Sequence, residues 1–104
     1  MAHEMAGKVT VVTGGATGIG RGIVELFVEE GAHVVIGDID EAAGTALANA
    51  LGESVRFQLT DVSEREGVRA LVDRAVDEFG DLHAMVNNAA ISGKFVNRFL
   101  DDDL

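Results

Sequence analysis

A glycine-rich segment near the start of the chain has the residue types and spacing needed to hold a phosphate. It reads TGGATGIG from Thr13 to Gly20 and follows the apolar run Lys8–Thr13. Gly14 permits a sharp turn out of a strand, and Gly18 removes a side chain where a pyrophosphate must approach the backbone. Gly20 lets the following helix pack close to a sheet. The segment therefore predicts a dinucleotide-binding loop.

The helix that begins in this segment adds an electrostatic contribution. Its free N–H groups and the positive end of its dipole would point at the bound phosphates. Thr17 and Ile19 would contribute mainly backbone N–H groups, and the Thr17 hydroxyl is a further donor. The strict G-x-G-x-x-G spacing fails at Ile23, so a plain glycine-rich turn remains the alternative interpretation of the spacing alone.

An acidic residue follows at the distance that a dinucleotide site needs. Asp38 stands just past a second apolar run, roughly 20 residues beyond the glycine segment, where a carboxylate binds the ribose hydroxyls of NAD. The alternative role for Asp38 is to cap the next helix. Asp40 is the better cap candidate, which leaves Asp38 for the ligand. We therefore predict NAD(H) as the cofactor.

Short β-rich runs alternate with helical patterns along the chain. We expect strands over Lys8–Thr13, Ala32–Gly37, Val55–Leu59 and Leu82–Asn87. Helices fall between them and end near Gly31, Gly52 and Gly80. Crossovers of this length join parallel strands, so the prediction is an α/β, Rossmann-type doubly wound parallel sheet in the order 3-2-1-4. Residues 1–7 are a tail, and 8–104 form a partial NAD-binding domain that stops after the fourth strand.

Apolar spacing also predicts which helix faces are buried. Ser63 and Glu66 form a capping box that opens the third helix. The stripes assigned to the core in the three helices are Ile19, Ile23, Leu26 and Phe27; Ala43, Ala46, Leu47, Ala50 and Leu51; and Val68, Leu71, Val72, Ala75, Val76 and Phe79.

Composition excludes several classes of function. The net charge of −10 disfavours nucleic-acid and anionic-membrane binding, because the chain repels phosphate backbones. There is no cysteine, and His3, His33 and His83 lack a ligand spacing, so we expect no metal site. No run is long and apolar enough to span a membrane, and no signal peptide is recognisable, so we expect a cytoplasmic protein.

Several motifs, taken together, resemble those of the short-chain dehydrogenase/reductase family. TGGATGIG is similar to the family's T-G-x-x-x-G-x-G, and Asn87-Asn88-Ala89-Ala90 resembles its N-N-A-G, with alanine at the last position. Asp61 and Val62 match the family's adenine-contacting pair. The resemblance covers nearly the whole chain from Gly7 and implies these cofactor-binding residues: Gly14, Thr17, Gly18, Ile19, Gly20, Asp38, Asp61, Val62, Asn88, Ala89 and Ala90.

The resemblance implies an oxidoreductase that transfers hydride between NAD and an alcohol or ketone. The family uses a Tyr as general acid/base and a Lys four residues later, helped by a Ser and an Asn. This chain has no tyrosine, so Lys8 and Lys94 lie outside any such pair, and Ser92 and Asn97 come too early for the other two roles. We therefore assign no catalytic residue and expect the 104-residue chain alone to be inactive.

The predicted sheet also lacks part of its covering. We expect some apolar surface of Val9, Val11, Met85 and Val86 to face water and the fourth strand to be a bare edge. The chain should then self-associate. For the complete enzyme, the family resemblance implies a homo-oligomer. Two alternatives remain: a non-catalytic NAD-binding module, and a structural fragment that binds nothing.

Overall fold

Four parallel strands form the sheet of the computed structural model, which describes residues 4–88. They are β1 (Val9–Thr13), β2 (His33–Asp38), β3 (Val55–Leu59) and β4 (Ala84–Asn87). The order β3-β2-β1-β4 is the one that the sequence predicted. The expected strands agree with the observed ones to within two residues at each end.

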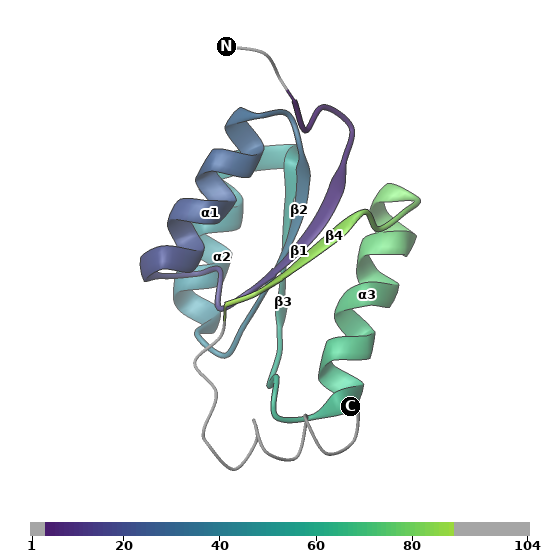
Figure 1. The fold of residues 1–104 in the computed structure, drawn as a ribbon. Helices are drawn as coiled ribbons and strands as arrows, with labels where there is room; N and C mark the ends of the chain where they lie inside the picture. The colour runs from purple at the N-terminus through teal and green to yellow at the C-terminus, as the bar shows by residue number, and fades with distance from the viewer. Residues whose placement is uncertain (1–3, 89–104) are drawn as a thin grey trace.

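Helices cover both faces of this sheet. In Figure 1, α1 (Gly18–Glu29) and α2 (Glu41–Leu51) lie on one side, and α3 (Arg65–Phe79) lies on the other. A short 3-10 turn (Gly52–Ser54) joins α2 to β3. This is the layering of a right-handed, doubly wound sheet, in which each crossover helix packs back onto the strands it connects.

A separate apolar cluster lies on each face. One contains Val12, Val24, Val34, Ile36, Leu47 and Val55, and the other contains Val9, Val11, Val35, Leu71 and Ala75. All five residues of β1 are buried, as is expected for a strand covered on both faces. The central strands therefore form a rigid base for the loops that follow them.

The outer strand β4 is less covered than β1. Met85 is 36% exposed, and Ala84 and Asn87 are also exposed. This agrees with the expectation that some apolar surface of this strand faces water. Val9 and Val11 are buried, because α3 packs over them.

The predicted core faces of α1 and α2 are partly wrong. Ile19 is 78% exposed and Leu26 is 51% exposed, whereas Gly20 and Val24 are buried. In α2 the exposed residues include Ala46 and Ala50, and the buried ones are Gly44 and Leu47. In α3 the prediction holds except at Val76, which is 45% exposed.

Buried glycines explain why the observed core faces of α1 and α2 differ from the predicted ones. Counting apolar side chains ignores glycine, yet a glycine can be the point of closest approach between a helix and a sheet. A Cβ on Gly44 would overlap the ring of Phe57 on β3, so α2 turns this glycine toward the sheet. On the other face the strand supplies the glycine, because a Cβ on Gly37 of β2 would overlap Leu71 of α3. At the helix ends glycine acts as predicted, with positive φ at Gly31, Gly52 and Gly80.

Candidate functional site

The loops that follow the strands gather at one end of the sheet, the lower end in Figure 1. Because all four strands are parallel, their carboxyl ends lie along the same edge. The glycine loop after β1, Asp38 at the end of β2, Asp61 after β3 and Asn88 after β4 therefore approach one another. Ligands of open α/β sheets bind at this edge.

The glycine loop turns sharply out of β1. Gly14 has φ +64°, and its N–H donates to the carbonyl oxygen of Gly37 at 2.7 Å. Gly15 and Ala16 are buried beneath the loop, where a Cβ on Gly15 would lie 3.1 Å from side-chain atoms of Ile36 and Val24. The turn predicted at Gly14 is therefore present, and Gly15 is a second position with little room for a side chain.

The start of α1 presents unfilled space. Gly18 has φ +58° and is exposed, and among residues 4–88 no atom lies within 4 Å of the position that a Cβ would take. Thr17 is the N-cap residue, and its side chain makes no capping hydrogen bond. The first N–H groups of a helix have no partner within the helix, so they can donate to an anion placed here.

Gly20 serves the loop as well as the helix. A Cβ at this position would overlap the carbonyl oxygen of Gly14 and the side-chain amide of Asn88. The sequence predicted that Gly20 allows close packing of helix on sheet. In the structure its lack of a side chain lets α1 approach both the glycine loop and the end of β4.

Asp38 links the end of β2 to the glycine loop. One of its carboxylate oxygens accepts from the N–H of Ala16 at 3.0 Å, and the other accepts from the N–H of Asp40 at 3.0 Å. Asp40 caps α2, accepting from the N–H of Ala43 at 3.0 Å. The prediction that Asp40 is the cap is confirmed. Asp38 therefore places a half-buried negative charge beside the loop.

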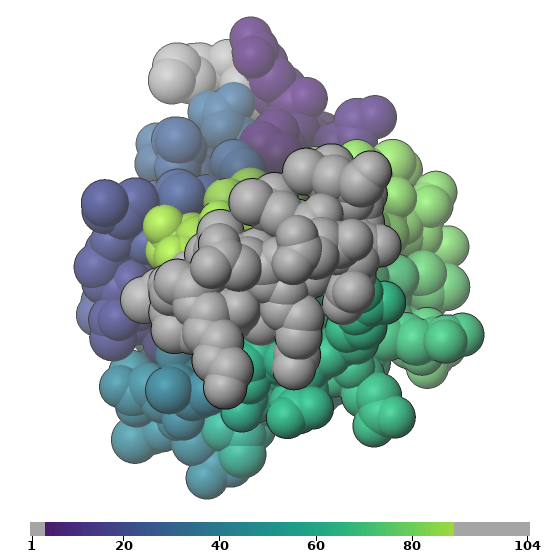
Figure 2. All heavy atoms as spheres, turned by 60° about the horizontal axis from the view of Figure 1, so that its bottom comes forward, coloured from purple at the N-terminus to yellow at the C-terminus, as the bar shows by residue number. Residues whose placement is uncertain are grey.

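Thr13 links the start of the glycine loop to the end of β4, a role that sequence reasoning missed. Its buried hydroxyl lies 3.1 Å from the side-chain oxygen of Asn87 and 3.3 Å from the carbonyl oxygen of Val86, and it accepts from the N–H of Asn88 at 3.0 Å. Asn88 in turn donates to the carbonyl oxygen of Gly14 at 3.2 Å. A polar residue ending an apolar strand was the available signal. In Figure 2 the yellow-green end of β4 emerges beside the dark-blue α1.

The turn between β3 and α3 is held by short-range contacts. Asp61 is exposed, and one of its carboxylate oxygens accepts from the N–H of Ser63 at 2.9 Å and from its hydroxyl at 2.6 Å. The bond from the Ser63 hydroxyl, and to a smaller extent the bond from its N–H, hold the pKa of Asp61 below its usual value. Val62, the other predicted adenine contact, is half-buried.

The predicted capping box does not have the expected register. The structure starts α3 at Arg65 with Glu64 as the N-cap residue and no side-chain capping bond there. The hydroxyl of Ser63 instead donates to Asp61, because the aspartate two residues earlier offers a charged acceptor.

Some predicted residues lie outside the described part of the chain. These are Ala89 and Ala90 of the last motif, and Ser92, Lys94 and Asn97, to which no catalytic role was assigned.

Within residues 4–88, no cluster of three metal-ligating side chains occurs, and no helix is long and apolar enough to cross a membrane. His33 stacks on Phe79 with ring centroids 4.6 Å apart, and Nδ1 of His83 accepts from the N–H of Val9 at 2.9 Å.

Known proteins are similar to this chain in sequence. The tasselseed-2 sex determination protein of Zea mays is 52% identical over 95 residues, which cover 90% of this chain and 28% of that protein. The L-fucose dehydrogenase of Bos taurus is 53% identical over 89 residues, which cover 86% of this chain and 33% of that protein. The chain thus spans about a third of the length of these curated relatives.

A solved structure and a family model agree with these relatives. The 3-ketoacyl-(acyl-carrier-protein) reductase from Brucella melitensis, complexed with NADH, superposes with a TM-score of 0.82 at 31% identity, covering 93% of this chain and 44% of that one. The family model described as short chain dehydrogenase matches residues 8–104. The chain belongs to the short-chain dehydrogenase family.

Proposed function

We propose that this chain is the NAD(H)-binding part of an oxidoreductase that transfers hydride between NAD and an alcohol or ketone. The observation that carries the proposal is the half-buried carboxylate of Asp38, which is hydrogen-bonded to the glycine loop that opens α1. An anion at the helix N-terminus and a diol beside the carboxylate match the diphosphate and the ribose of an adenosine diphosphate. The reductase from Brucella melitensis that shares the fold was solved with NADH.

The described residues fit such a ligand. Unfilled space at Gly18 leaves room for a pyrophosphate, with N–H groups of Thr17, Ile19 and Gly20 as donors. Gly14 and Asn88 hold the loop in shape. Asp61 and Val62 would contact the adenine, and the resemblance adds Ala89 and Ala90. The nicotinamide, when bound, would accept or donate the hydride.

The same geometry favours NAD(H) over NADP(H). A 2′-phosphate would bring a second negative charge to roughly 5 Å from Asp38, a repulsion of about 3 kcal/mol at an effective dielectric of about 20. That energy corresponds to about a hundredfold in affinity. Arg21, in the first turn of α1, pairs with Glu25 at 3.2 Å, so its charge is partly offset before any phosphate binds.

We assign binding, and no catalytic step, to the residues of this chain. It contains no tyrosine, the residue that the family resemblance implies as general acid/base. Without a positioned acid/base the rate should fall by about 10²–10⁴-fold from that contribution alone. For the whole protein we propose an alcohol or ketone as the substrate, a homo-oligomeric state and a cytoplasmic location.

Competitive titration of NAD against NADP tests the assignment of Asp38. The unchanged protein should prefer NAD by about a hundredfold, and Asp38→Ala should reduce that preference to near equality. Asp38→Asn keeps an acceptor oxygen for the Ala16 N–H while removing the charge, so it separates repulsion from loop positioning. Asp40→Ala is the matched control, because it removes a carboxylate two residues away that caps α2.

Three results would contradict the proposal. Equal affinity for both dinucleotides in the unchanged protein, or a preference for NADP, would remove the role of Asp38. A loss of preference in Asp40→Ala equal to that in Asp38→Ala would show that only net charge matters. If neither dinucleotide binds, the chain is the structural fragment named above as an alternative.

A further inference from the structure

The outer strand β3 exposes a backbone edge that needs an explanation. It is the last strand on its side of the described sheet, and such a strand offers unpaired N–H and C=O groups to any other extended chain. The N–H of Thr60 donates to Asp38 at the end of β2. Alternate residues of a strand face opposite neighbours, so Val55, Phe57 and Leu59 direct their backbone groups outward.

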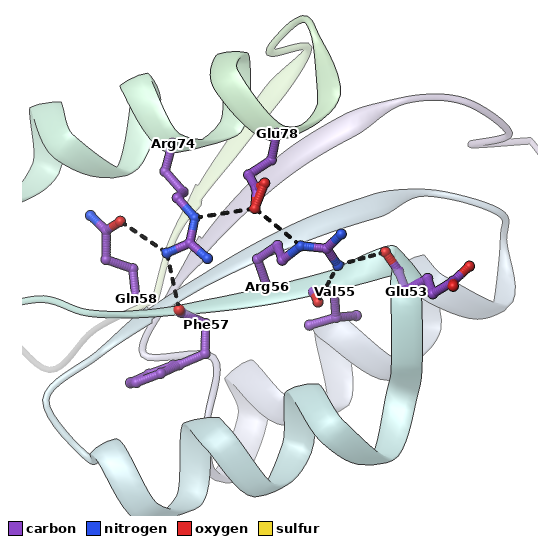
Figure 3. Close-up of polar contacts among 7 residues, drawn as sticks. All are labelled: Glu53, Val55, Arg56, Phe57, Gln58, Arg74 and Glu78. Atoms are coloured by element: carbon purple, nitrogen blue, oxygen red, sulfur yellow. Dashed lines mark hydrogen bonds and ion pairs between the residues drawn. The ribbon is translucent and has the colours of Figure 1, made fainter.

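Two arginine side chains cover the outward carbonyls of Val55 and Phe57 (Figure 3). Arg56 donates through one guanidinium nitrogen to the carbonyl oxygens of Val55 at 3.0 Å and Glu53 at 2.8 Å. Arg74, from α3, donates to the carbonyl oxygen of Phe57 at 3.4 Å. The N–H of Val55 is also satisfied, by the carbonyl oxygen of Gly52. The outward N–H and C=O groups of Val55 and the outward C=O group of Phe57 are therefore already hydrogen-bonded.

A single carboxylate holds both arginines in place. One oxygen of Glu78 lies 3.2 Å from Nε of Arg56 and 3.7 Å from Nε of Arg74. The guanidinium of Arg56 also lies over the ring of Phe79, 5.3 Å from its centroid. The planar guanidinium can bond a carboxylate and a carbonyl at once, which an ammonium group does less well.

We propose that Arg56, Arg74 and Glu78, here called the edge clamp, close the outer edge of β3 against the addition of another strand. An incoming strand would have to displace guanidinium groups from the carbonyls that it needs as acceptors. It would also place two arginines, whose side chains are one-third exposed, beside its own backbone. The opposite edge differs, because the exposed residues Ala84 and Met85 of β4 carry no charge.

The absence of cysteine from the sequence permits a site-specific test. Leu59→Cys, at an exposed position on β3, would carry a nitroxide label that reports when two β3 strands lie side by side in any register. Glu78→Gln in this background should raise the fraction of label in close pairs by about tenfold at equal concentration, equivalent to ~1.4 kcal/mol. Met85→Cys should report no change at β4.

Glu25→Gln is the matched control. It removes the same charge from the exposed Arg21–Glu25 pair of α1, and it should leave the label at position 59 unpaired. If Glu78→Gln fails to fold by circular dichroism, Arg74→Lys decides instead, because it keeps the charge but weakens the bond to Phe57, and it should also increase pairing. No increase in the folded variant, or an equal increase in Glu25→Gln, would overturn the proposal.

Discussion

The glycine loop and the β3–α3 turn lie at the same end of the sheet, but they are held in different ways. In the loop, Ala16 bonds Asp38 across 22 residues of sequence, and Asn88 bonds Thr13 across 75. In the turn, Asp61 bonds Ser63 two residues away. The loop therefore takes its shape from the whole fold, whereas the turn takes much of its shape from its own sequence.

This difference separates two kinds of binding element. A loop fixed by long-range contacts is preorganised, so little order has to be gained when a ligand binds. It is also vulnerable, because a change at one residue disturbs strands that are distant in sequence. A turn fixed by neighbouring residues tolerates change with smaller consequences. Substitutions at matched positions in the two regions should reveal the contrast.

The largest effect is expected at Gly20. Gly20→Ala would force a Cβ into the carbonyl oxygen of Gly14 and the amide of Asn88. Overpacking of this kind should lower the free energy of unfolding by about 1–3 kcal/mol, measured by urea denaturation.

Gly22 provides the control for that substitution within the same helix. A Cβ on Gly22 would meet nothing within 4 Å, so Gly22→Ala should stabilise α1 by about 0.5–1 kcal/mol. These two glycine-to-alanine substitutions lie two residues apart in α1. They should nevertheless change the free energy of unfolding in opposite directions. If Gly20→Ala were neutral, the loop would be less tightly connected to β4 than the structure indicates.

The second effect concerns Gly18, where backbone strain and ligand space can be separated. Gly18→Val and Gly80→Val both place a side chain at positive φ, and no atom of residues 4–88 lies within 4 Å of the new Cβ in either case. Each should cost about 1–2 kcal/mol of stability. Only Gly18→Val should also abolish NADH binding, because its side chain would occupy the space left for the pyrophosphate.

Calorimetric titration of NADH against both variants and the unchanged protein measures this. Gly80 caps the far end of α3, so its substitution keeps the strain and leaves the loop intact. Loss of binding in both variants would attribute the effect to instability. Unchanged affinity in Gly18→Val would mean that the glycine segment is only a turn.

The same contrast accounts for what the sequence could predict. Strands, helix ends and the fold follow from local patterns: apolar runs, and glycines at positive φ such as Gly31 and Gly80. The cap at Asp40 was predicted correctly because its partner is three residues away.

Long-range contacts were not predictable in this way. The bond between Thr13 and Asn88 joins residues that only the folded sheet brings together. The buried face of α2 was misplaced because Gly44 gains its importance from the ring of Phe57 on a later strand. Apolar periodicity contains no information about such a partner.

The smallest effect is expected in the β3–α3 turn. The hydroxyl of Ser63 is the largest cause of the lowered pKa of Asp61, so Ser63→Ala should raise that pKa toward its usual value. A carboxyl whose pKa is lowered by folding stabilises the native state above its unfolded pKa, and this contribution is lost as the pH falls through the folded pKa. The variant should therefore be slightly less stable than the unchanged protein at neutral pH, and the pH-dependent part of that difference should disappear in acid.

An NMR titration of the Asp61 carboxyl carbon measures the shift, with Ser54→Ala as a control that makes the same chemical change before β3 instead of after it. A pKa of Asp61 that stays low in Ser63→Ala would show that the backbone N–H of residue 63 suffices, and that the turn is even less dependent on its side chains than its two bonds suggest.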